Sequence, residues 1–115
     1  MTTSTVGMIA IAERNPRIAK ALTYYQRGDW FNLYKAWETI RDGVGGEKVL
    51  LHEKRWTTKK FKDRFTQTVN NSELIGDEAR HGVWREQQPS APMSMDEAQE
   101  FVSGLIRTWI READA

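Results

Sequence analysis

Cysteine is absent from this 115-residue chain, and no apolar run approaches the roughly 20 residues that span a bilayer. The first absence excludes a disulfide framework, a thiolate zinc site and a cysteine nucleophile. No basic residue precedes the apolar stretch near the start, "MTTSTVGMIAIA", so we expect no secretory signal. We therefore expect a cytoplasmic protein that does not associate with a membrane.

A large charge of one sign is also absent. The chain has 17 Lys and Arg against 16 Asp and Glu, a net charge of +1. Such a balance gives the molecule as a whole little electrostatic attraction for nucleic acid or acidic lipid. A partner of that kind would have to bind a local cluster of charges.

Several catalytic motifs are missing. The chain has no HExxH, no GxxxxGK[ST] and no GxSxG pattern. "GVGGEK", 43–48, follows a helical pattern and is interpreted as a helix stop. His52 and His81, without cysteine, form a poor set of metal ligands, so we expect no metal and no cofactor.

The composition is that of a globular protein. Hydrophobic residues make up 39% and charged residues 29% of the chain, and five tryptophans argue for a packed interior. The length fits one domain, 1–115.

Capping residues predict a helical hairpin over 15–44. Asn15 and Pro16 are typical of a helix start, and Gly28 of a helix end. Asp29 can cap a second helix at once. That helix is predicted to end within "DGVGG", 42–46.

The middle of the chain is less regular. "EKVLLHEKRW", 47–56, fits either a short helix or an extended connector. Thr57 is predicted as the next N-cap, with Trp56 and Phe61 as a hydrophobic staple. Phe61, Phe65 and Val69 then lie at core spacing on one helix face.

The last helix shows the clearest pattern. Ser94 and Glu97 have the spacing of a capping box. A continuous apolar face follows, and it contains Ala98, Phe101, Val102, Leu105, Ile106, Trp109 and Ile110. The sequence thus predicts an all-α, single-domain bundle of four to five helices with its core in 15–112. Within the remaining segment 1–13, residues 5–12 fit a helix or a strand that another chain completes.

One cluster of polar residues falls within "GDEARHG", 76–82. Asp77, Glu78 and Arg80 lie on a predicted short helix from about 73 to 80, and His81 lies at its C-terminal end. One interpretation is a binding or acid–base site in which a carboxylate orients His81 and Arg80 holds an anion. The other is a structural bracket of ion pairs at a helix end.

A basic segment, "KRWTTKKFKDRF", is the second candidate site. Its cations are Lys54, Arg55, Lys59, Lys60, Lys62 and Arg64. Cations interleaved with aromatic residues suit a phosphate backbone and stacked bases. The alternative is a solvated helix face whose aromatic residues point into the core.

Three stretches, "DWFNLYKAWETIRDGVGG", "RFTQTVNNSELIGDEARHG" and "PMSMDEAQEFVSGLIRTWI", give the chain a resemblance to a protein family. Together they resemble small bacterial helical proteins of the HEPN-like and abortive-infection type, over about residues 13–112. The resemblance implies a bundle of four or five helices and frequent dimerisation. In many members it also implies metal-independent RNA cleavage linked to phage defence or toxin systems.

The chain departs from the RNA-cleaving pattern of that family, in which an Arg precedes a His by four to six positions. Before His81 those positions hold Ile, Gly and Asp, and before His52 they hold Gly, Glu and Lys. We therefore predict a non-catalytic interaction or binding module that forms a homodimer or binds a larger protein. The alternative is a metal-independent RNA-directed enzyme or an RNA-binding protein.

Overall fold

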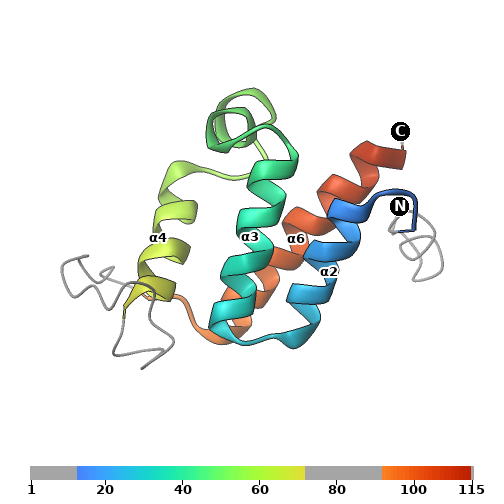
Figure 1. Cartoon of the computed structure of the whole chain (residues 1–115). Helices are drawn as coiled ribbons and strands as arrows, with labels where there is room; N and C mark the ends of the chain where they lie inside the picture. The colour runs from blue at the N-terminus through green and yellow to red at the C-terminus, as the bar shows by residue number, and fades with distance from the viewer. Residues whose placement is uncertain (1–12, 72–91, 115) are drawn as a thin grey trace.

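Two antiparallel helices joined by a two-residue turn begin the fold (Figure 1). The computed structural model describes residues 13–71 and 92–114, so the alternatives for residues 5–12 lie outside the described residues. Helix α2 spans Pro16–Arg27 and helix α3 spans Trp30–Gly43. The predicted hairpin is confirmed.

The capping chemistry explains where these helices begin and end. Asn15 Oδ1 accepts hydrogen bonds from the backbone N–H groups of Arg17 and Ile18, at 3.2 and 3.3 Å. Gly28 ends α2 in the left-handed conformation, with φ of 76°. Asp29 then caps α3 by accepting from the N–H of Asn32 at 2.8 Å. Each of the three predicted caps is confirmed.

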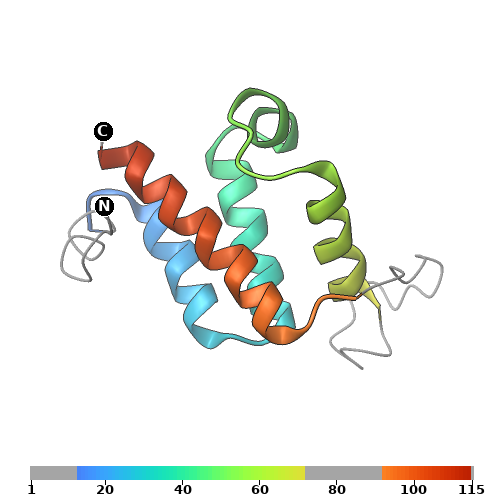
Figure 2. The same cartoon turned by 180° about the vertical axis from the view of Figure 1, so that it is seen from behind.

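Two further helices complete the bundle. α4 spans Lys59–Asn70, and α6 spans Met95–Asp114. α6 crosses one face of the hairpin and contacts both α2 and α3, while α4 lies beside α3 (Figures 1 and 2). The fold is all-α: no strand occurs in the described ranges. None of the helices described there is both long and apolar enough to cross a bilayer.

The core lies where α3, α4 and α6 meet. It contains the buried rings of Trp37 and Phe65, against which the partly buried Phe101 packs, with ring centroids 5.0 to 6.5 Å apart. Each ring comes from a different helix, so this trio connects the three helices. The other buried apolar residues are Ile18, Ala21, Leu33, Ala36, Ile40, Leu50, Leu51, Val69, Met93, Ala98, Val102, Leu105, Ile106, Trp109 and Ile110.

The segment between α3 and α4 is short and helical rather than extended. Val49–Glu53 forms a π-helical turn, labelled η1, that buries Leu50 and Leu51. Arg55 follows in the left-handed conformation, with φ of 54°, and reverses the chain toward α4.

The predicted start of α4 is wrong by one residue. Thr58, and not Thr57, is the N-cap, and its hydroxyl accepts from the N–H of Phe61 at 3.2 Å. Phe61 therefore occupies the third helical position, so it and Trp56 do not form the predicted staple. Two adjacent threonines are equally suited to capping, and the path of the preceding turn decides between them.

Phe61 was also predicted to face the core, and this is wrong. Its side chain is 50% exposed, whereas Phe65 and Val69 on the same spacing are buried. Helical spacing defines a face of α4, but only neighbouring elements can cover it. The rings of Trp37 and Phe101 cover Phe65, which lies one turn beyond Phe61.

Trp109 of α6 packs closely against a glycine of the hairpin. Gly43 ends α3, and a Cβ atom there would lie 2.6 Å from Cζ2 and Cη2 of Trp109. That distance is far inside van der Waals contact, so no larger residue fits unless the indole moves. Trp109 is 7% exposed, which confirms its predicted burial.

We expect Gly43→Ala to destabilise the protein by about 1–3 kcal/mol, because the added methyl group overpacks the Trp109 ring. Trp109→Ala should cost about 3–5 kcal/mol through lost burial. Combining Gly43→Ala with Trp109→Leu should remove most of the glycine penalty, since the clash is with the indole. Chemical denaturation of the four proteins in the Gly43→Ala and Trp109→Leu cycle measures this coupling.

Gly104 provides a matched control. It lies within α6, and a Cβ atom there would meet only Arg107 Nη2, at 4.0 Å. Gly104→Ala should therefore stabilise the protein by about 0.5–1 kcal/mol through helix propensity alone. Equal effects of alanine at both positions would contradict the close approach.

Candidate functional site

The predicted polar cluster Asp77, Glu78, Arg80 and His81 lies outside the described residues, as does the short helix expected over about 73–80. Whether this cluster is a site or a bracket remains a prediction. The basic segment, 54–64, lies within the described residues.

Three cations of the basic segment connect elements of the fold. Lys54 pairs with Glu112 of α6, and its Nζ lies 5.4 Å from the centroid of the Trp56 ring. Lys62 Nζ lies 3.3 Å from Glu47 Oε1 and 2.5 Å from Asp63 Oδ1. Arg64, discussed below, contacts α6. These three cations therefore form ion pairs within the fold.

The charges around Asp63 reinforce one another. Hydrogen bonds from Lys59 and Lys62 lower the pKa of the Asp63 carboxyl. Burial by itself lowers the pKa of Lys62, but its bond to Asp63 and the attraction of Glu47 outweigh burial and raise it. Both groups therefore stay charged at neutral pH and hold the first turns of α4 together.

The other cations of the segment are exposed. Arg55 and Lys60 make no ion pair with a described residue, and Lys59 has a 72% exposed side chain although it contacts Asp63. Exposed Phe61 is adjacent to Lys60. The structure thus divides the basic segment into a structural half and a solvent-facing half.

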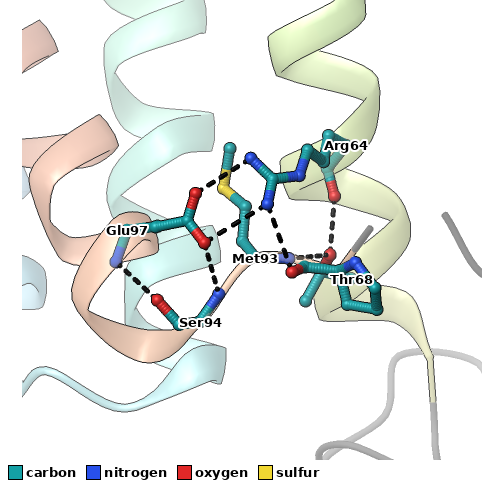
Figure 3. Close-up of polar contacts among 6 residues, drawn as sticks. Arg64, Thr68, Met93, Ser94 and Glu97 are labelled. Atoms are coloured by element: carbon teal, nitrogen blue, oxygen red, sulfur yellow. Dashed lines mark hydrogen bonds and ion pairs between the residues drawn. The ribbon is translucent and has the colours of Figure 1, made fainter. Parts of the chain in front are cut away.

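Arg64 forms a polar latch with the start of α6 (Figure 3). Its guanidinium donates two hydrogen bonds to the Glu97 carboxylate, at 3.0 and 3.2 Å, and one to the carbonyl of Pro92 at 3.3 Å. This bidentate arrangement is the strongest geometry for an Arg–carboxylate pair. It joins α4 to α6 over 33 positions of sequence.

Glu97 has a second role in the same latch. Ser94 and Glu97 form the predicted capping box, with reciprocal bonds of 3.1 and 3.2 Å. Beside it, the buried hydroxyl of Thr68 donates to the carbonyl of Arg64 at 2.7 Å and accepts from the N–H of Met93 at 3.1 Å. The chain before α6 is therefore fixed against α4. The sequence predicted the capping box and placed Arg64 in the basic segment, but it did not reveal that Arg64 and Thr68 bind the start of α6.

An open groove lies between α2 and α3, away from the basic segment. Its volume is about 330 Å³. Its lining residues recur at helical spacing on facing sides of the two helices, which is why a continuous groove forms. They are Arg17, Lys20 and Tyr24 of α2 and Lys35, Glu38, Thr39, Asp42 and Gly43 of α3.

The groove is polar and contains charges of both signs. Glu38 lies 3.5 Å from Lys35 and 3.9 Å from Arg41, and Asp42 accepts a 2.9 Å bond from Arg41. Arg17 and Lys20 are exposed and make no ion pair with a described residue. Sequence analysis missed the groove because no short motif marks it.

No group of three His, Asp or Glu side chains in the described ranges is arranged to hold a metal ion. His52 is exposed on η1. No protein-family model, curated protein or solved structure matches this chain.

The latch should make the stability of the fold depend on pH in the acidic range. Its bond to Arg64, followed by the backbone bond from Ser94, lowers the pKa of Glu97. A carboxyl with a lowered pKa stabilises the fold above its unfolded pKa of about 4.3, and this stabilisation is lost as pH falls through the folded value. We expect Glu97→Gln to lower the Tm at pH 7, and the difference from the parent to shrink below about pH 4.

Hydrogen bonds from Lys59 and Lys62 lower the pKa of Asp63 as well, so Asp63→Asn serves as the comparison. In the Glu97→Gln protein the remaining acid sensitivity should come from Asp63 and other carboxyls. A Tm difference that stays constant from pH 7 to pH 3 would show that the Glu97 charge does not contribute to the latch.

Proposed function

We propose that the protein is a non-catalytic binding module whose ligand occupies the α2–α3 groove. One observation carries the proposal: two cations that line this groove, Arg17 and Lys20, make no ion pair with a described residue. By contrast, Lys54, Lys62 and Arg64 are held by acidic partners. A cavity of about 330 Å³ is at the lower end of the range of small-ligand sites.

The expected homodimer or larger protein partner belongs to this proposal, as do the bacterial defence context and the cytoplasmic location. The groove is formed within one chain, so ligand binding does not require a second copy. A homodimer would present two such grooves.

A fragment screen followed by ¹H–¹⁵N correlation spectra tests the proposal. We expect fragments that bind to shift the amide signals of the groove residues. Thr39→Trp should block the groove without changing its charge and remove these shifts.

Thr23→Trp is the matched control. Thr23 and Thr39 each donate a hydroxyl to the carbonyl four residues earlier, at 3.0 and 2.8 Å, but Thr23 does not line the groove. It should leave fragment binding intact. Fragments that shift only amides outside the groove would refute the proposed site.

A second candidate function is RNA binding at the start of α4. The exposure of Phe61 favours it, because an exposed ring beside Lys59 and Lys60 is available for stacking on a base. The family that the sequence resembles also favours it. The missing Arg-to-His spacing argues against RNA cleavage.

If RNA binds there, its affinity should fall steeply with salt, and Lys59→Ala/Lys60→Ala should reduce the slope of log K against log salt by about 1.4. Phe61→Ala should weaken binding at every salt concentration. Arg27→Ala/Arg111→Ala, which removes the same charge from α2 and α6, should change the slope little. RNA that stays unbound at low salt would exclude this function, and RNA cut without metal would instead favour the enzyme.

A further inference from the structure

We propose that the α2–α3 groove binds a small anion with two or more negative charges, and that Arg17 and Lys20 hold it. This inference rests on the proposed function, since it names the class of ligand for the same groove. It follows from the balance of charge in the groove, from its shape and from the position of Arg17.

The balance of charge favours an anion. Three lining residues are cationic and two are acidic. Both acids already have cationic neighbours: Arg41 bonds Asp42 at 2.9 Å, and Lys35 lies 3.5 Å from Glu38. Arg41 is not a lining residue, so it neutralises the acids without filling the groove. The surplus positive charge therefore belongs to Arg17 and Lys20.

Arg17 and Lys20 are well placed to act together. They lie one turn apart on α2, so their Cβ atoms are about 5–6 Å apart. A guanidinium binds two oxygens of one phosphate or carboxylate at once, and an ammonium adds a point charge. Two such groups on one helix face can share a ligand that carries more than one negative charge.

Arg17 reaches from α2 to the end of α3. Arg17 Cδ lies 3.6 Å from the position of a Cβ atom on Gly43, so the stem of Arg17 is in van der Waals contact with α3 at this point. The charged end of Arg17 is therefore held at the edge of the groove by a packed stem.

The size of the groove selects small anions. A volume of about 330 Å³ cannot enclose a folded domain or a duplex, but it is sufficient for a phosphate ester or a short oligocarboxylate. These two sources share the chemistry of clustered anionic oxygens. Inorganic pyrophosphate represents the first and citrate the second.

Calorimetric titration and amide shift mapping with each probe test the inference. We expect at least one probe to bind the parent, to shift groove amides and to bind more weakly as salt increases. Arg17→Gln/Lys20→Gln should weaken binding at least about tenfold, as expected when charged hydrogen bonds are lost. Lys59→Gln/Lys60→Gln, with the same loss of charge on α4, should bind like the parent.

Variants of Arg41 distinguish binding in the groove from nonspecific attraction between the anion and the positive charges of the protein. Arg41→Gln should weaken binding because Asp42 and Glu38 lose a cationic neighbour and repel the anion. Arg41→Gln/Asp42→Asn removes one charge of each sign and should restore most of the affinity. All variants should retain the parent's amide spectrum outside the groove, which verifies that they fold.

Binding of pyrophosphate alone would identify phosphate compounds, and binding of citrate alone would identify carboxylates; either supports the inference. It is overturned if Arg17→Gln/Lys20→Gln binds as tightly as the parent, or if neither probe shifts groove amides. If neutral fragments still occupy the groove in that case, the binding function stands and only the ligand class is wrong. If no compound occupies it, both proposals fail.

Discussion

Gly43 has no side chain, and the Trp109 ring occupies the space where one would lie. A Cβ atom at Gly43 would be 2.6 Å from that ring, whereas Arg17 Cδ, at 3.6 Å, would be in ordinary van der Waals contact with it. The close approach to the ring lets α6 pack onto the hairpin with Trp109 buried. Arg17 lies against the same end of α3, beside the groove. The core and the candidate site thus meet at Gly43.

The distribution of charge separates structure from function. The acids Glu47, Asp63, Glu97 and Glu112 come from the segment before η1, from α4 and from α6, and each pairs with a cation of the basic segment. The pairs of Glu47, Glu97 and Glu112 connect different elements, whereas Asp63 pairs within α4. A segment that looks like a nucleic-acid patch therefore mostly stabilises the bundle. Exposed pairs of this kind contribute little singly, but the latch combines a bidentate pair with a capping box and a buried hydroxyl.

The sequence was sufficient wherever the cause is local. Asn15, Gly28 and Asp29 act through backbone groups within three residues, and Ser94 and Glu97 form a capping box by spacing alone. Thr58 shows where local information fails, because Thr57 has the same chemistry and only the path of the preceding turn separates them. The predicted burial of Phe61 is wrong for a related reason. Spacing assigns a residue to a helix face, but the neighbouring helices decide whether that face is covered.

The candidate site could not be predicted in the same way. Arg64 meets Glu97 across 33 positions, and no pattern in the sequence connects them. The groove requires knowing which edges of α2 and α3 lie opposite each other, whereas apolar spacing reveals only the faces that turn to α6. Arg17 and Lys20 form no motif in the sequence, and their relation to α3 appears only when the two helices lie side by side.

The contact on which this account depends can be observed directly in solution. In a nuclear Overhauser spectrum of the parent protein, we predict cross-peaks between the Gly43 Hα protons and the Hζ2 and Hη2 protons of Trp109. The Arg17 Hδ protons should show cross-peaks to the same glycine from the other side. A spectrum in which the Trp109 ring contacts other core residues but not Gly43 would contradict the account.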